Sequence, residues 1–171
     1  MMTVPWSIKN AEDVDQLTWN SYCTINLANY LMDRNEKIGI IAKGCDCRSV
    51  VNHIVEGKVK RENVVIIGVP CEGMVDSRII STKFGSLVEE VVESDNSITV
   101  KGDGKEESFD RADVLRQNCK VCVHKNPVLY DELAGDLVDE PEVDRYEEVE
   151  KVEALETEDR WNHFEELIST C

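Results

Sequence analysis

The clearest pattern along the chain is a pair of short apolar runs on either side of an amphipathic segment. Residues 37–42 (KIGIIA) and 63–69 (NVVIIGV) are rich in β-branched side chains, which predicts two buried strands. Between them, apolar residues in 48–59 recur at helical spacing. A strand, a helix and a second strand in this order predict a βαβ unit, whose strands are parallel and whose crossover is right-handed.

A different pattern follows the βαβ unit. Residues 72–85 predict a short helix and a loop, and residues 87–92 and 97–100 predict two paired strands. A Gly-Asp-Gly turn at residues 102–104 then leads into a third short strand at residues 107–109. The expected fold class is therefore α/β, with α+β as the alternative: a small parallel βαβ core with an inserted antiparallel meander.

Amphipathic segments also lie near both ends of the chain. Residues 22–32 have apolar positions at helical spacing, and residues 159–168 predict a helix within an acidic tail. Residues 136–171 hold 14 acidic and three basic side chains, which gives them a net charge of −11. We therefore expect a cysteine-rich α/β domain over residues 1–136 and an acidic linker and helix over residues 137–171.

Charge and the terminal sequence limit the classes of function. The 171-residue chain has a net charge of −16, which repels phosphate backbones and argues against nucleic-acid binding. The first residues lack the basic and apolar regions of a signal peptide. No apolar run reaches the roughly 18 residues that a membrane span needs. We expect no membrane insertion and a cytoplasmic location, in which thiols stay reduced.

Seven cysteines are the residues best suited to carry chemistry. An odd number of cysteines in a reducing compartment argues against a disulfide framework, which leaves metal ligation, catalysis or burial. The seven are Cys23, Cys45, Cys47, Cys71, Cys119, Cys122 and Cys171.

Two cysteines form a Cys-x-x-Cys motif, and a third follows the best-defined strand. Cys119 and Cys122 have the spacing that zinc sites, iron–sulfur clusters and dithiol redox centres all use. Cys71 lies in the sequence GVPCEG at the carboxyl end of the second predicted strand, the edge at which open α/β sheets bind ligands. Its neighbours Pro70 and Gly73 are expected to shape a tight loop there.

The sequence GCDCR at residues 44–48 follows the first predicted strand. Because parallel neighbouring strands end at the same edge, Cys45 and Cys47 are expected beside the Cys71 loop. Arg48 opens the predicted helix, where its charge and the helix amides favour an anionic group such as cluster sulfur or a cofactor phosphate. No Gly-x-Gly-x-x-Gly or P-loop motif is present. The residues expected to contact a cofactor are Gly44, Arg48, Pro70 and Gly73.

These cysteines could supply four thiolate ligands to one metal centre. Cys71, Cys119 and Cys122 supply three, and either Cys45 or Cys47 supplies the fourth. Four cysteine thiolates are the usual ligands of a [4Fe–4S] cluster, with zinc or no metal as the alternatives. An enzyme that uses Cys71 as a nucleophile is a further alternative.

Read together, these motifs resemble the beta-subunit family of coenzyme-deazaflavin-reducing hydrogenases and related dehydrogenases. The resemblance rests on the Gly-Val-Pro-Cys loop that ends at Cys71, and on Cys119 and Cys122 followed by a Gly-Asp pair at residues 135–136. It covers residues 37–136. It implies that these three cysteines bind a [4Fe–4S] cluster near a flavin such as FAD.

The same resemblance bears on the fourth ligand and on partners. Cys45 and Cys47 compete for the place of the fourth thiolate, and Cys45 is the preferred candidate. In the related proteins the helix equivalent to residues 159–170 leads into a ferredoxin motif, so Cys171 is expected to begin a second cluster site in a module that this chain lacks. The expected partner is that ferredoxin-like module or another redox subunit, and a homo-oligomer is left open.

The leading hypothesis is an electron-transfer domain or subunit of an anaerobic oxidoreductase of the hydrogenase or dehydrogenase beta-subunit type. The alternative is a non-catalytic assembly domain, zinc-bound or metal-free, whose acidic tail docks a partner subunit. Cys23, on a predicted helix face, is expected to serve packing only.

Overall fold

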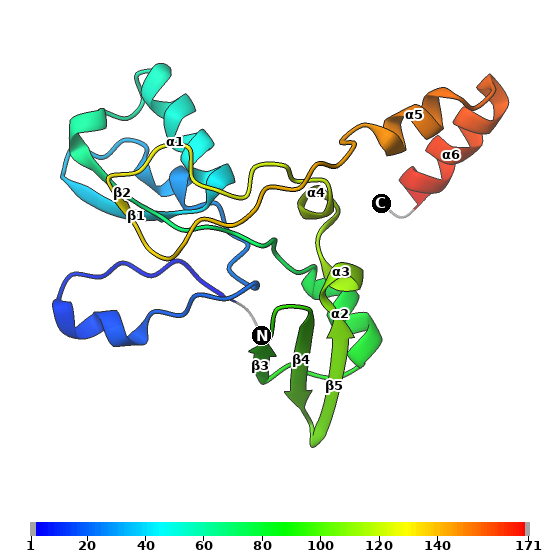
Figure 1. Ribbon diagram of the computed structural model, residues 1–171, viewed down its shortest axis with the longest axis horizontal. Coiled ribbons are helices and arrows are strands. Elements are labelled where there is room, and N and C mark those ends of the chain that lie inside the picture. The colour runs from blue at the N-terminus through cyan, green and yellow to red at the C-terminus, as the bar shows by residue number, and fades with distance from the viewer. Residues whose placement is uncertain (1–2, 170–171) are drawn as a thin grey trace.

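A parallel sheet and its crossover helix form one half of the protein (Figure 1). The computed structural model describes residues 3–169. Strands β1 (Ile38–Ala42) and β2 (Val64–Gly68) pair in parallel along their whole lengths, and α1 (Gly44–Val55) connects them. The predicted βαβ unit is confirmed.

A third strand extends this sheet, and the sequence pattern did not predict it. β6 (Glu132–Leu133) pairs in parallel with β2, with Glu132 opposite Ile67. Asp131 fixes the approach to the strand because its carboxylate accepts a hydrogen bond from the Ile66 N–H at 2.8 Å and forms an ion pair with Arg61 at 2.5 Å. Two residues are too few to show strand periodicity, so the hydrophobic pattern could not predict this strand. Its position depends instead on the contacts of the Asp131 side chain.

Helix α1 begins earlier than predicted. We expected it to open at Arg48, but its first residue is Gly44, because the Asp46 carboxylate caps it by accepting a hydrogen bond from the Lys43 N–H at 3.3 Å. Gly44 cannot be replaced by a larger residue without movement, since a Cβ there would lie 2.6 Å from the His124 carbonyl oxygen. The early start puts Cys45 and its neighbours on a helix instead of a loop.

The antiparallel meander is confirmed as a separate three-stranded sheet. β3 (Glu90–Glu93), β4 (Ser97–Gly102) and β5 (Lys105–Asp110) pair in chain order. The helices α2 (Ser77–Phe84) and α3 (Arg111–Val114) precede and follow it. Asp110 caps α3, with its carboxylate accepting a hydrogen bond from the Ala112 N–H at 2.9 Å.

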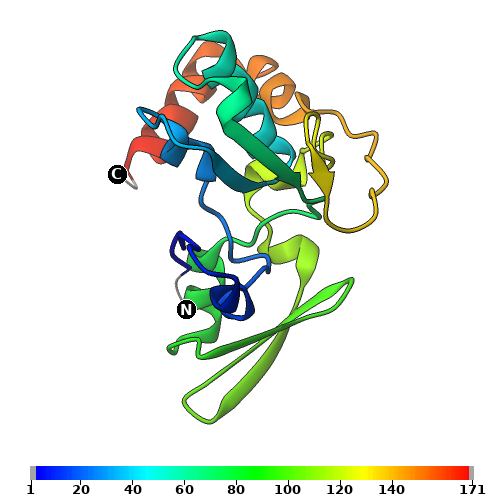
Figure 2. The same ribbon diagram turned by 90° about the vertical axis from the view of Figure 1, so that its left-hand side faces the viewer.

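The two sheets bury separate hydrophobic cores and lie in separate lobes, one above the other in Figure 2. The fold class is α/β, with the parallel sheet and the antiparallel sheet side by side in one chain. The parallel lobe buries residues of β1, α1 and β2, including Ile40, Val50 and Ile66. The antiparallel lobe buries Ile80 and Ile98 among others. The chain passes between the lobes in residues 22–28, after β2 and again after α3, so each crossing is close to a cysteine.

The helix predicted over residues 22–32 is wrong. Only a five-residue 3-10 helix, η2 (Leu27–Leu31), forms there. The Asn26 side chain accepts a hydrogen bond from the Ala28 N–H and starts η2 late, and Met32 is already extended. The other short helical elements are η1 (Ala11–Gln16), η3 (Arg61–Asn63) and α4 (Gln117–Lys120).

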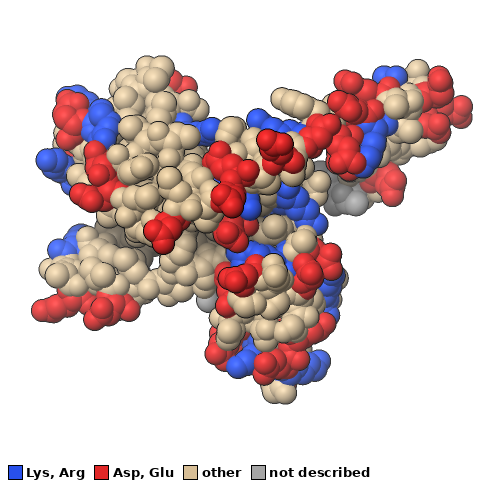
Figure 3. Space-filling view, in the orientation of Figure 1, with Lys and Arg blue, Asp and Glu red and all other residues tan. Residues whose placement is uncertain are grey.

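The acidic tail contains two helices. The predicted helix is confirmed as α6 (Thr157–Ser169), and α5 (Glu147–Glu153), which was not predicted, precedes it. Both stand away from the two lobes, and acidic side chains cover much of their visible surface (Figures 1 and 3). No helix within residues 3–169 is long and apolar enough to cross a membrane.

Candidate functional site

The carboxyl ends of β1 and β2 bring two cysteines together. Cys45 lies in the first turn of α1, directly after β1, and Cys71 lies three residues after β2. The Val69 N–H donates to the Ala42 carbonyl at 2.9 Å, so the two chains stay paired beyond the strands. Burial and the charge of Asp46 raise the pKa of the Cys45 thiol, and the charge of Cys71 raises it further.

The Cys-x-x-Cys motif also lies near Cys71. Cys119 is on α4 and Cys122 follows it, with the Cys122 N–H donating to the Cys119 carbonyl at 3.3 Å. The Cys71 N–H donates to the Lys125 carbonyl at 3.0 Å, which ties the Cys71 loop to the chain just after the motif. A Cβ at Gly73 would lie 3.4 Å from the Cβ of Cys119. Three cysteines from two other chain segments, Cys45, Cys119 and Cys122, therefore lie near Cys71.

The environment of Cys71 acts on its ionisation in both directions. Burial raises the pKa of the Cys71 thiol, and the charges of Cys119 and Cys122 raise it further. The Gly73 N–H, whose nitrogen is 3.4 Å from the sulfur, donates to it and opposes this rise, as does the positive charge of Lys43. A thiol with a raised pKa is a poor nucleophile at neutral pH, which argues against the alternative of an enzyme that uses Cys71 as its nucleophile.

Cys47 does not join this group. Its side chain is fully buried in the core of the parallel lobe, where its thiol donates to the Ala42 carbonyl at 3.6 Å. Because α1 already includes residue 45, two further residues turn Cys47 to the opposite side of the helix, toward β1 and β2. Cys23 also lies apart, with its thiol near the Thr18 carbonyl, and Cys171 falls outside the described residues.

The residues predicted to contact a cofactor lie around the same edge. Gly44 packs against the backbone of residues 124–126, and Arg48 is one helical turn beyond Cys45. Pro70 faces Gly135 just beyond β6, where a Cβ on the glycine would come within 3.9 Å of the proline ring. Gly73 has a φ of +103°, which favours glycine and supports the tight loop that was predicted.

Lys43 is the residue of this region that the sequence reasoning missed. Its side chain is only 3% exposed, and its Nζ lies 2.7 Å from the buried Asp46 carboxylate. It also donates to the carbonyl oxygens of Cys23 and Ile25 at 3.2 Å each. A lysine before a glycine has no recognised capping signature, so only the structure reveals this buried charge beside Cys45 and Cys71.

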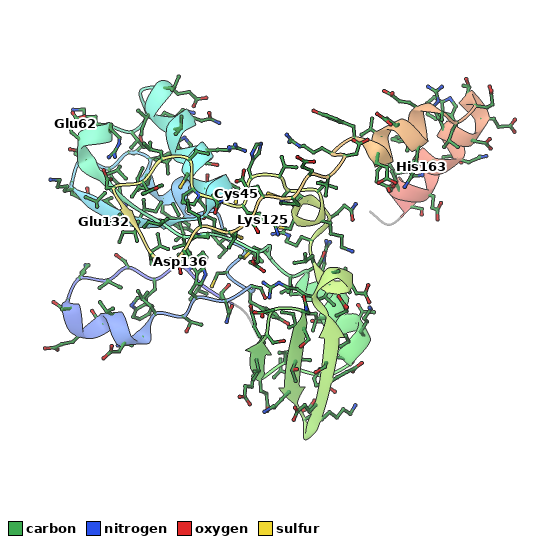
Figure 4. The ribbon with its side chains drawn as sticks, viewed as in Figure 1. Cys45, Glu62, Lys125, Glu132, Asp136 and His163 are labelled. Carbon is green, nitrogen blue, oxygen red and sulfur yellow. The ribbon has the colours of Figure 1, made fainter. Side chains whose placement is uncertain are left out.

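A cavity of about 280 Å³ opens beside the cysteines. Residues of α1, of the chain after α4 and of the acidic tail line it, among them Cys45, Arg48, Cys122, His124, Arg145 and Tyr146. Figure 4 shows Cys45 and Lys125 near the centre of the molecule, whereas His163 lies far off on α6. The acidic tail thus contributes to the wall of the site through Arg145 and Tyr146.

The described part of the chain does not contain three His, Cys, Asp or Glu side chains grouped to hold one metal ion. Zinc needs four ligands converging on a single ion. A [4Fe–4S] cluster instead gives each cysteine its own iron, so its four sulfurs stay apart from one another.

Comparison with known proteins does not place the chain in a family. No family model matches it, and no curated protein matches it at a significant level. The resemblance to hydrogenase beta subunits therefore stays a prediction.

The raised pKa of Cys45 predicts slow alkylation of the metal-free protein. Although Cys45 is exposed at the surface, surrounding protein atoms partly desolvate its thiol. This desolvation, then the charges of Asp46 and Cys71, raise its pKa to about 11, with Lys43 opposing the change. Because only the thiolate reacts, we expect the rate with iodoacetamide to rise about tenfold per pH unit from pH 8 to near pH 11. Mass spectrometry of Cys45 after timed quenching measures this rate.

The urea-unfolded chain is the control for this measurement. There the thiol has a pKa of about 8.5, so its alkylation rate should level off near pH 9. Equal rates at Cys45 in the folded and unfolded chains at pH 8 would contradict the prediction.

Proposed function

We propose that this protein is an electron-transfer domain or subunit of an anaerobic oxidoreductase that binds a [4Fe–4S] cluster. The observation that supports this most is the proximity of three cysteines, from two other chain segments, to Cys71. The proposed ligands are Cys45, Cys71, Cys119 and Cys122. Such a cluster accepts and donates single electrons.

The chain's own residues would hold and tune this centre. The Gly73 N–H donates to the sulfur of Cys71, and the Lys43 charge favours the ionised forms of Cys45 and Cys71. Amide hydrogen bonds to sulfur and nearby positive charge stabilise added negative charge, so both favour the reduced form. Burial of Cys71 works in the opposite direction because it excludes water from the centre.

The proposed electron partner is a ferredoxin-like module or another redox subunit. The resemblance of the cysteine motifs supports this choice, and the same resemblance implies a flavin such as FAD nearby. Cysteines that serve as thiolate ligands must stay reduced until the metal binds, which supports a cytoplasmic location.

Anaerobic reconstitution tests the proposal directly. The chain is incubated with ferrous iron, sulfide and a thiol reductant, desalted, and assayed for iron, acid-labile sulfide and zinc. We expect about four irons and four sulfides per chain and a brown colour. A colourless protein with one zinc per chain, or with no metal, would overturn the proposal in favour of an assembly domain.

A further inference from the structure

The cavity beside the cysteines differs in charge from the rest of the protein. The chain has 35 aspartates and glutamates against 19 lysines and arginines. None of the described residues that line the cavity is acidic, whereas Arg48, Arg145 and His124 are among them. In a chain of net charge −16, a hollow lined by two arginines and no carboxylate provides a local site for negative charge.

These two arginines are also free to bind a ligand. Within residues 3–169, neither Arg48 nor Arg145 forms a side-chain hydrogen bond or an ion pair, whereas Arg61, Arg78 and Arg111 are each paired with a carboxylate. The guanidinium group binds phosphate and carboxylate through two parallel hydrogen bonds. Two such groups on different chain segments could contact one anion from two sides.

The size and the remaining walls of the cavity limit what can enter. Its volume of about 280 Å³ lies just below the range of about 300–1,000 Å³ that is typical of small-molecule sites. The cavity is therefore too small to enclose a dinucleotide. The ring of Tyr146 and the side chains of Val121 and Val123 provide apolar surface. These walls suit a compact organic molecule better than a bare inorganic ion.

We propose that this cavity binds a small organic anion, with its phosphate or carboxylate held by Arg48 and Arg145 and its apolar part against Tyr146. The site goes beyond cluster binding, because the two arginines that would hold the anion are not among the proposed cluster ligands. Cys45 and Cys122 form part of its wall, so the bound anion lies next to the proposed redox centre.

Calorimetric titration of the full chain tests this site. The probes are phenyl phosphate, benzoate and the neutral benzyl alcohol, and inorganic phosphate serves as a bare anion. We expect at least one aromatic anion to bind, with benzyl alcohol and inorganic phosphate each about tenfold weaker or worse. The stronger of phenyl phosphate and benzoate identifies the preferred anionic group.

Substitution of the arginines locates the binding. Arg48→Gln and Arg145→Gln should each weaken binding of the preferred anion about tenfold or more, because each removes a charge-assisted contact. Arg116→Gln is the matched control, since Arg116 is exposed and is not part of the cavity wall. Arg145 lies in the exposed tail, so its variant keeps the test valid if the Arg48 variant fails to fold.

The outcomes separate this site from the cluster. Anion binding that Arg145→Gln leaves unchanged, or that Arg116→Gln weakens equally, would overturn the assignment, as would the absence of binding by both aromatic anions. Titrations with and without reconstituted iron are compared. Anion binding in a chain that takes up no iron would support the anion site and overturn the proposed cluster. Iron uptake in a chain that binds neither aromatic anion would support the cluster and overturn the anion site.

Discussion

Replacing Cys71 with serine is expected to abolish almost all iron binding on reconstitution. The unchanged chain is expected to bind about four irons. The Cys71 loop lies between the other proposed ligands: Gly73 approaches Cys119, and the Cys71 N–H donates to the Lys125 carbonyl just after Cys122. A serine hydroxyl is a far poorer ligand for iron than a thiolate. Iron and sulfide assays, together with visible absorption, measure the loss.

A pair of variants on α1 provides the matched control. Cys45→Ser should lose cluster binding as Cys71→Ser does, whereas Cys47→Ala should keep it, because the Cys47 side chain is buried in the core on the other side of the helix. Both variants change one cysteine of the same first turns of α1, so a general effect on the helix would appear in both. Iron loss in a folded Cys47→Ala variant would contradict the proposed ligand set.

The topology of the parallel lobe could be predicted because its signals are local and strong. Two β-branched runs around an amphipathic segment give β1, α1 and β2, and parallel pairing then fixes that both strands end at one edge. The approach of residue 45 to Cys71 follows from this topology alone. β6 could not be found in the same way, because its pairing depends on the distant contact between Asp131 and Ile66.

The composition of the cysteine group was only partly predictable. The sequence alone does not distinguish Cys45 from Cys47 as a metal ligand. Because α1 starts at Gly44, both lie on the helix, and their spacing of two residues places their side chains on different sides of it. That start depends on Asp46 capping Lys43, which is not a standard capping pair. The cavity was also not predictable, since Arg145 and Tyr146 reach it from a tail whose sequence indicates only a charged linker.

Replacing Asp46 with alanine is expected to lower the free energy of unfolding of the metal-free protein by about 3–5 kcal/mol. Asp46 is 1% exposed and pairs with Lys43, which is 3% exposed, so the substitution leaves a buried ammonium group without its counter-charge. Lys43 would keep its hydrogen bonds to the carbonyls of Cys23 and Ile25, which places the expected loss toward the lower end. Urea unfolding followed by circular dichroism measures the change.

The double variant Lys43→Met, Asp46→Leu tests whether the loss comes from the unpaired charge. Removing both charges should recover part of the stability, because apolar side chains of similar size avoid the desolvation cost of the ion pair. Recovery should be incomplete, since the carbonyls of Cys23 and Ile25 would lose their shared donor. Glu36→Ala, which breaks the exposed ion pair with Arg34, should leave stability unchanged. A double variant less stable than Asp46→Ala would mean that the pair stabilises this edge of the sheet beyond neutralising a buried charge.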